Sequence, residues 1–158
     1  MPNWVYTDLE VTGPEKEIKW FEKVAATPGY NGKGKQALTE EAFIPYPKKY
    51  REIDRLHEQE EKEWQAQMKK DGVDKIDGNT PEWKDWEANH PRKYPRDAFN
   101  LEKSQGESGY NWRIRCWGSK WGFCNVSKIN REDGMIKYYY ETAWSPVKPL
   151  LKKMSRMF

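Results

Sequence analysis

Residues 120–142 carry the pattern of a β-hairpin, and this feature limits the possible folds more than any other. One extended run spans Lys120 to Asn130, and a second run, rich in aromatic and branched residues, spans Met135 to Thr142. Between them, Arg131-Glu132-Asp133-Gly134 ends in an Asp-Gly pair, which accepts the positive φ angles that tight turns need. The pattern predicts two antiparallel strands joined at this turn.

Each end of the chain adds a helix to this hairpin. A short extended run from Trp4 to Val11 stops at Thr12-Gly13-Pro14, and Pro14 occupies the first turn of a helix. After the hairpin, Ser145-Pro146 predicts the start of a last helix, with Ser145 as its cap. Both helices have apolar residues at spacings of three and four, which predicts one buried face for each: Ile18, Phe21, Val24 and Ala25 in the first, and Val147, Leu150, Leu151, Met154 and Phe158 in the last.

The middle of the chain reads as a charged insertion at residues 29–108. We expect a long polar helix at about residues 48–70, and a short helix at about residues 81–89 that Thr80 caps. Residues 111–117 have a period that fits a helix or a strand, and Gly118 favours a helix because it can terminate one. The predicted fold is α+β, one ferredoxin-like domain over residues 1–158 in the order βα-insertion-ββα.

The composition is polar but rich in rings. Charged residues make up 34% of the chain and its mean hydropathy is −1.14, values that taken alone are typical of disorder. The chain also has 9 Trp, 9 Tyr and 5 Phe, whose large side chains can sustain a small core. We therefore expect a folded protein with a thin aromatic core.

The net charge of +3 is unevenly distributed. Residues 1–47 and 48–108 each carry two more acidic than basic side chains, whereas residues 109–158 carry ten Lys and Arg against three Asp and Glu. A local excess of this size attracts acidic partners more strongly than the overall charge would. The simpler interpretation is a solvated basic surface.

Several short motifs at the two ends of the chain resemble one known family. They are Met1-Pro2-Asn3-Trp4, Val11-Thr12-Gly13-Pro14, Asn111-Trp112, Trp117-Gly118-Ser119-Lys120-Trp121 and Thr142-Ala143-Trp144-Ser145-Pro146. Together they look like the YubB-type ferredoxin-like proteins, small and mostly uncharacterised products of phages, plasmids and other mobile elements. This resemblance implies a βαββαβ fold. The sequence ends at Phe158, on the second helix of that pattern, so the fourth strand is missing from the expected order. Another segment fills its place, the sheet has three strands, or the chain is a shortened relative.

Basic and aromatic residues interleave in the last fifty residues, which indicates a contact surface for nucleic acid or a protein partner. Rings can stack on unpaired bases while cations meet phosphates. In a strand, Tyr138 and Tyr140 share one face and Tyr139 takes the other. The competing interpretation places these rings in the core, as burial preferences favour for the Trp residues. The candidate contact residues are Arg113, Arg115, Lys120, Trp121, Lys137, Tyr138, Tyr140, Lys152, Lys153 and Arg156.

No catalytic, cofactor or metal signature stands out in the sequence. Cys116 and Cys124 are eight residues apart, a spacing that fits no structural zinc motif, and His57 and His90 are the remaining soft ligands. The N-terminus lacks a signal-peptide pattern, and no apolar run is long enough to cross a bilayer. We expect no cofactor, no metal, no membrane contact and a location in the cytoplasm of a bacterial host cell.

These observations predict a non-enzymatic binding protein of a phage or mobile element. Its expected role is to inhibit or modulate a host nucleic-acid-handling or defence system, through contact with a host or phage protein, with nucleic acid, or with both. The alternative is a small nucleotide-binding or nucleic-acid-processing enzyme whose site has no recognisable motif. A homo-oligomer formed through a free sheet edge is a further possibility.

Overall fold

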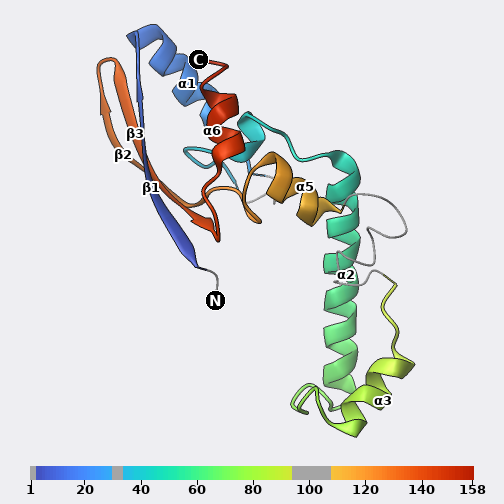
Figure 1. The fold of residues 1–158 in the computed structure, drawn as a ribbon. Coiled ribbons are helices and arrows are strands. Elements are labelled where there is room, and N and C mark those ends of the chain that lie inside the picture. The colour runs from blue at the N-terminus through green and yellow to red at the C-terminus, as the bar shows by residue number, and fades with distance from the viewer. Residues whose placement is uncertain (1–2, 30–33, 94–107) are drawn as a thin grey trace. The chain divides into compact units, whose positions relative to one another are not determined.

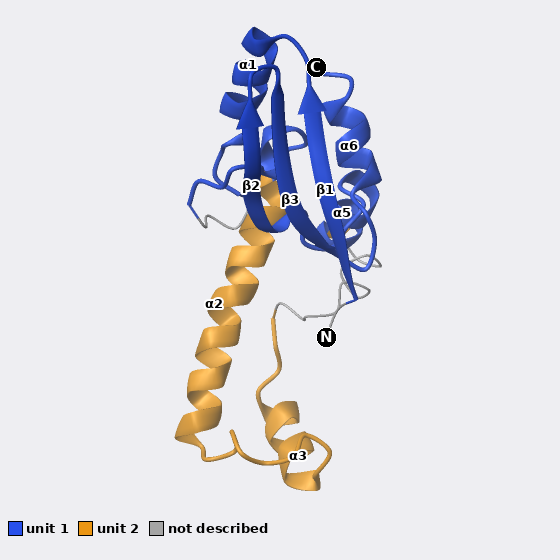
Figure 2. Cartoon of the chain, turned by 90° about the vertical axis from the view of Figure 1, so that its left-hand side faces the viewer, with its two compact units in different colours: residues 1–47, 109–158 blue, residues 48–108 orange. Residues whose placement is uncertain are grey.

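The structure is a computed structural model that describes residues 3–29, 34–93 and 108–158. Its elements form two compact units, one built from residues 1–47 and 109–158 and the other from residues 48–108 (Figure 2). Each unit is described by itself. Parts of the predicted insertion, residues 30–33 and 94–107, lie outside the described residues.

A three-stranded antiparallel sheet forms the centre of the first unit (Figure 1). Its strands are β1 (Trp4–Thr12), β2 (Cys124–Glu132) and β3 (Met135–Ala143), in the order β1-β3-β2. The predicted hairpin is confirmed, because β2 and β3 meet at a turn where Gly134 has a φ of 73°. The strand predicted to begin at Lys120 begins four residues later, since residues 117–123 form turns and bends.

The pairing of β1 with β3 is unbroken from Trp4 opposite Ala143 to Thr12 opposite Met135. The pairing of β2 with β3 is irregular, with register shifts between Cys124 and Ser127 and between Lys128 and Asn130. The two outer strands therefore differ: β1 is regular and β2 is bulged.

Helices α1 (Glu15–Ala25) and α6 (Lys148–Met154) lie on the same side of the sheet (Figure 1). The buried side chains of these helices are the apolar ones that the spacing predicts, because a period of 3.6 residues gathers them on one face. They pack with buried side chains of β3 to form an aromatic core with Phe43 and Tyr46, and its helical members are Ile18, Phe21, Ala25, Leu150 and Met154.

The last helix begins later than predicted. Ser145 does not cap it: its hydroxyl donates to the carbonyl of Gly118, and Val147 occupies the N-cap position. Helix α5 (Gly109–Cys116) confirms the helical interpretation of residues 111–117. A 3-10 turn, η1 (Glu40–Ala42), precedes the packed loop that contains Tyr46.

The second unit contains α2 (Lys48–Lys70) and α3 (Pro81–Asn89), which occupy the positions predicted for the long and the short helix. As predicted, Thr80 caps α3, since its hydroxyl accepts a hydrogen bond from the Trp83 N–H. Three indole rings hold the two helices together: the centroid of Trp64 lies 5.6 Å from that of Trp83 and 4.9 Å from that of Trp86. The guanidinium of Arg92 covers Trp64 at 3.9 Å and pairs with Glu61 at 2.6 Å.

Candidate binding surface

The end of α5 and the start of α6 are packed tightly against each other in the first unit. Gly118 has a φ of 86° and its N–H donates to the carbonyls of Arg113 and Ile114, which ends α5. A Cβ at Gly118 would lie 2.6 Å from Cδ of Pro149, so the two segments are in direct contact.

Two buried residues beside Gly118 fix this junction to the rest of the unit. Trp117 is fully buried, and its indole N–H donates to the carbonyl of Ile44 at 2.8 Å. Ser119 is also fully buried, and its hydroxyl donates to the carbonyl of Ala143 at the end of β3. The position of α5 relative to the sheet is therefore held by buried hydrogen bonds.

The positive excess of the last fifty residues lies in these two packed segments and not in the hairpin. Residues 109–123 contain three Lys and Arg, residues 144–158 contain four, and neither segment contains Asp or Glu. The hairpin, residues 124–143, contains three of each sign. Arg113, one of these seven cations, is engaged with Tyr46. We call the other six the basic helical surface: Arg115, Lys120, Lys148, Lys152, Lys153 and Arg156.

The cations in and just after α6 are the best-defined members of the basic helical surface. Lys148, Lys152 and Lys153 are exposed on α6, away from the buried Leu150 and Met154, and Arg156 is exposed in the turn that follows the helix. Within the described ranges, none of the four forms an ion pair. Four unpaired cations with no neighbouring acid in sequence are suited to bind an anionic partner.

Lys120 combines charge with aromatic surface. Its ammonium lies 5.1 Å from the ring centroid of Trp121 and 5.7 Å from that of Tyr110. Trp121 is half-buried against Trp4, and Tyr110 is exposed. Trp144, which follows directly on β3, is 57% exposed. Tyr110 and Trp144 are exposed rings that were not among the residues predicted from the sequence, although the local mixture of Lys and rings could have indicated them.

Arg113 has a different role from the other predicted contact residues. Its Nη1 donates to the Tyr46 hydroxyl at 3.3 Å, and its guanidinium lies 5.2 Å from the centroid of that buried ring. Arg113 is therefore engaged in packing α5 against the core.

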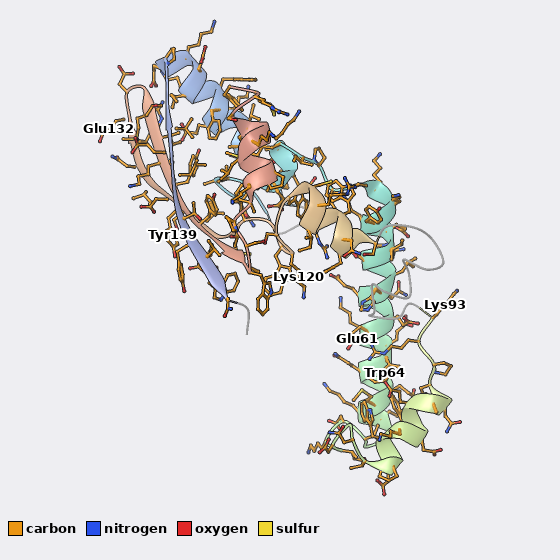
Figure 3. All side chains as sticks on the ribbon, in the orientation of Figure 1. Glu61, Trp64, Lys93, Lys120, Glu132 and Tyr139 are labelled. Carbon is orange, nitrogen blue, oxygen red and sulfur yellow. The ribbon has the colours of Figure 1, made fainter. Side chains whose placement is uncertain are left out.

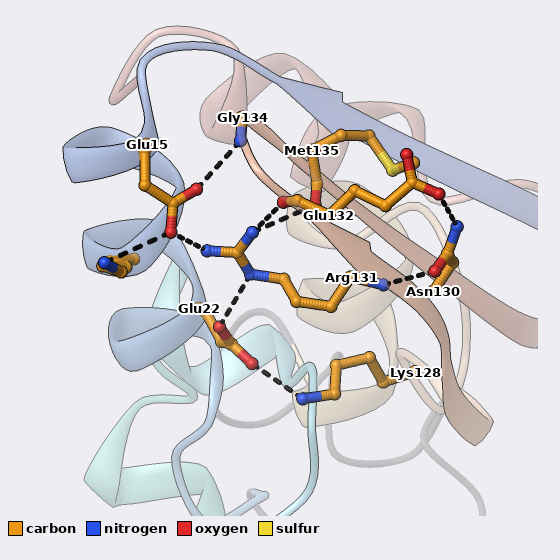
Figure 4. Close-up of polar contacts among 9 residues, drawn as sticks. Glu15, Glu22, Lys128, Asn130, Arg131, Glu132, Gly134 and Met135 are labelled. Carbon is orange, nitrogen blue, oxygen red and sulfur yellow. Dashed lines mark hydrogen bonds and ion pairs between the residues drawn. The ribbon is translucent and has the colours of Figure 1, made fainter.

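The cations of β2 are engaged with α1 (Figure 4). Arg131 pairs with Glu15 at 2.6 Å and with Glu22 at 3.3 Å, and Lys128 pairs with Glu22 at 2.8 Å. The hydrogen bond from Arg131, helped by the Gly134 N–H, lowers the pKa of Glu15 from 4.5 to about 2. The hydrogen bond from Lys128 lowers the pKa of Glu22 as well. These pairs join the helix to the sheet.

Tyr138 and Tyr140 were predicted to be contact residues, and this is wrong. Both are buried, at 0% and 1% exposure, because β3 turns them toward α1 and α6 together with Ile136. Desolvation raises the pKa of both hydroxyls. Tyr139 takes the other face, as Figure 3 shows, where its hydroxyl donates to Glu141 at 2.9 Å.

The open face of the sheet is acidic, not basic. It carries Asp8, Glu10, Glu132 and Glu141, and its cation is Lys137, which pairs with Asp8 at 3.4 Å. Lys137 thus lies on the face opposite α6, so the predicted contact residues do not form one continuous surface. Of the other predicted residues, Arg115 lies on α5, Lys152 and Lys153 lie on α6, and Arg156 lies in the turn after α6. Lys120 and Trp121 lie in the turns and bends between α5 and β2.

Within residues 3–29, 34–93 and 108–158, no group of three or more His, Cys, Asp and Glu side chains is arranged to hold a metal ion. The thiols of Cys116 and Cys124 are not joined in a disulfide. Among the helices described, none combines the length and apolar character required to cross a membrane.

Residues 124–158 match the family model of the ferredoxin-like domain in Api92-like protein. The matched segment contains β2, β3 and α6. The fold is ferredoxin-like α+β with a helical insertion, as the sequence predicts. The matched model describes a ferredoxin-like family that is uncharacterised. No curated protein and no solved structure matches the chain.

Proposed function

We propose that this chain is a non-enzymatic binding protein that contacts nucleic acid through the basic helical surface. The observation that carries the proposal is the separation of charge in the first unit. The two segments packed at the α5–α6 junction hold seven cations and no acid, whereas the cations of the hairpin are balanced or paired. A phosphate backbone is the polyanion that such a surface would recognise.

The two rings near Lys120 and the exposed ring of Trp144 at the end of β3 support a preference for single strands. Tyr110 and Trp144 are exposed, and Trp121 is half-buried. Unpaired bases stack on exposed rings of this kind, whereas the bases of a duplex are already stacked on each other. A single-stranded segment could therefore use both the rings and the α6 cations.

The biological setting is part of the same proposal. We infer a YubB-type protein of a phage or other mobile element that modulates a host nucleic-acid-handling or defence system. The resemblance of the terminal motifs to that family supports this setting, and the match of residues 124–158 to a ferredoxin-like domain is compatible with it.

Fluorescence anisotropy with a labelled single-stranded 20-mer and a matched duplex tests the proposal. The single strand should bind more tightly, and its affinity should fall steeply as salt rises, because each phosphate contact releases counterions. The double variant Lys152→Glu/Lys153→Glu should flatten the slope of log K against log salt by about 1.4, since each single-strand contact contributes about 0.7.

A matched control is the double variant Lys16→Glu/Lys23→Glu, which makes the same charge change at exposed positions of α1. It should leave the slope nearly unchanged if binding is local. An equal decrease of the salt slope in both double variants would show that binding depends only on the net charge of the protein. Capture from bacterial lysate with and without nuclease then separates a nucleic-acid target from a host protein, and retention of neither would contradict the proposal.

A further inference from the structure

The outer edge of β1 presents a regular set of unpaired backbone groups. The Gly13 N–H donates to the Gly134 carbonyl at one end of the β1–β3 ladder, and the Trp144 N–H donates to the Asn3 carbonyl at the other. In an antiparallel ladder only alternate residues of a strand bond to the same neighbour. The odd-numbered residues of β1 therefore bond to β3, and the N–H and C=O groups of the even-numbered residues point outward.

Among the residues that the structure describes, no strand pairs with this edge. The other outer strand, β2, is interrupted by two register shifts, which make it a poor template for a further strand. The nine-residue β1 has an unbroken register, so it is the edge at which a strand can be added.

An apolar groove of about 470 Å³ runs along the same edge. Residues on both faces of β1 contribute to it, from Leu9 through Gly13, so the groove reaches the edge and is not enclosed beneath one face. The rest of its lining comes from α1, α6 and the residues after α6, and includes the apolar side chains of Ile18, Phe21, Leu151, Met154 and Phe158.

The charges beside the groove define the partner. The described residues that line the groove include Glu10 and Glu17 and no Lys or Arg. Asp8 and Glu10 are both exposed on the open face, next to the outward backbone groups. Lys137 lies opposite Glu10 in the ladder and pairs with Asp8 at 3.4 Å, so the two carboxylates and this one lysine together keep a net negative charge. An added strand alternates its side chains between the two faces, so one set would enter the groove and the other would lie beside these carboxylates.

We propose that the β1 edge binds an extended segment of a partner protein in which apolar residues alternate with Lys or Arg. The apolar side chains fill the groove, the basic side chains pair with Asp8 and Glu10, and the backbone adds a fourth strand to the sheet. A second copy of β1 fits less well. Antiparallel self-pairing centred on residues 8–10 sets Asp8 or Glu10 opposite an acid of the other copy, and like charges in that position are unfavourable.

The test uses the whole chain and three synthetic seven-residue peptides: one alternating Lys and Val, one alternating Glu and Val, and the Lys-Val peptide with its alternate amides N-methylated. The Lys-Val peptide should bind at least tenfold more tightly than either of the others. The N-methylated peptide keeps the charge and the apolar side chains but cannot pair with β1. Equal binding of that peptide would overturn strand addition, and no binding of the Lys-Val peptide would overturn the site.

The double variant Asp8→Lys/Glu10→Lys should reverse the preference, so that the Glu-Val peptide binds more tightly. The control Glu132→Lys/Asp133→Lys makes the same charge change at the exposed end of the hairpin and should keep the original order. Loss of the Lys-Val preference in both variants would show that only net charge acts. Light scattering that shows a dimer, abolished by Glu10→Pro, would instead assign the edge to a second copy.

This site does not depend on the basic helical surface. Different substitutions test peptide binding and nucleic-acid binding. A failure of one proposal can therefore be distinguished from a failure of the other.

Discussion

Replacing Gly118 by alanine measures how firmly the α5–α6 junction is held. A Cβ at this position would lie 2.6 Å from Cδ of Pro149 and 3.2 Å from the carbonyl oxygen of Pro146. Cβ atoms in proteins essentially never come within 3.0 Å of another heavy atom, so α6 would have to shift. The basic helical surface would shift with it.

The expected loss of stability has three contributions. A left-handed backbone conformation costs an L-residue about 1–2 kcal/mol. Overpacking against the Pro149 ring adds about 1–3 kcal/mol, because that ring cannot rotate away. The lower backbone entropy of alanine in the unfolded chain returns about 0.4–1 kcal/mol. Gly118→Ala should therefore lower the free energy of unfolding of the first unit by about 1–4.5 kcal/mol.

Gly34→Ala is the matched control. Gly34 also has a positive φ, of 54°, but a Cβ added there would have no atom of the described residues within 4 Å, so only the backbone contributions apply. This substitution should lower the free energy of unfolding by about 1 kcal/mol or less. Urea unfolding followed by hydrogen exchange of β3 amides reports on the first unit. Equal losses at the two glycines would refute the packing argument.

Three further predictions concern other parts of the chain. The pKa of Glu15 is about 2 in the folded protein against 4.5 unfolded, so its pairing with Arg131 stabilises the fold fully above about pH 4.5 and this stabilisation is lost as pH falls toward 2. The difference in free energy of unfolding between the wild type and Glu15→Gln should therefore shrink over that pH range. A constant difference would contradict this prediction. Trp83→Ala should destabilise the second unit by about 1–3 kcal/mol, since the half-buried ring packs on Trp64, and hydrogen exchange in α2 should report it. Trp144→Ala should weaken single-strand binding by about 1–3 kcal/mol per stacked base without changing the salt slope, and an altered slope with unchanged affinity would exclude stacking.

The order of the elements could be predicted because local signals agree with the fold. The Asp-Gly turn, the Thr80 cap and the apolar spacing of the helices are each determined within a few residues, and the structure keeps all of them. The start of α6 could not be predicted in the same way. Ser145 makes a tertiary hydrogen bond to Gly118, and only the folded chain brings these two residues together.

The sequence of β3 itself indicates which of its faces is buried, and this indication contradicts the predicted exposure of Tyr138 and Tyr140. Ile136 shares its face with Tyr138 and Tyr140, whereas Lys137 and Glu141 share theirs with Tyr139. The face of a strand that carries charged residues is expected to be exposed to solvent, and the structure confirms this for β3. The pairing of Lys128 and Arg131 with α1 had no such signal, because it joins residues more than a hundred positions apart.

The pairing of Trp4 with Ala143 has a consequence for biosynthesis. The first strand leaves the ribosome early, yet its neighbour in the sheet is translated only after the whole second unit. Residues 48–108 can collapse on their own contacts during that interval, while β1 waits with both of its edges open. Long-range pairing of this kind is slow and exposes the nascent chain to association, so residues 4–12 stay open to other chains until residues 135–143 have been translated.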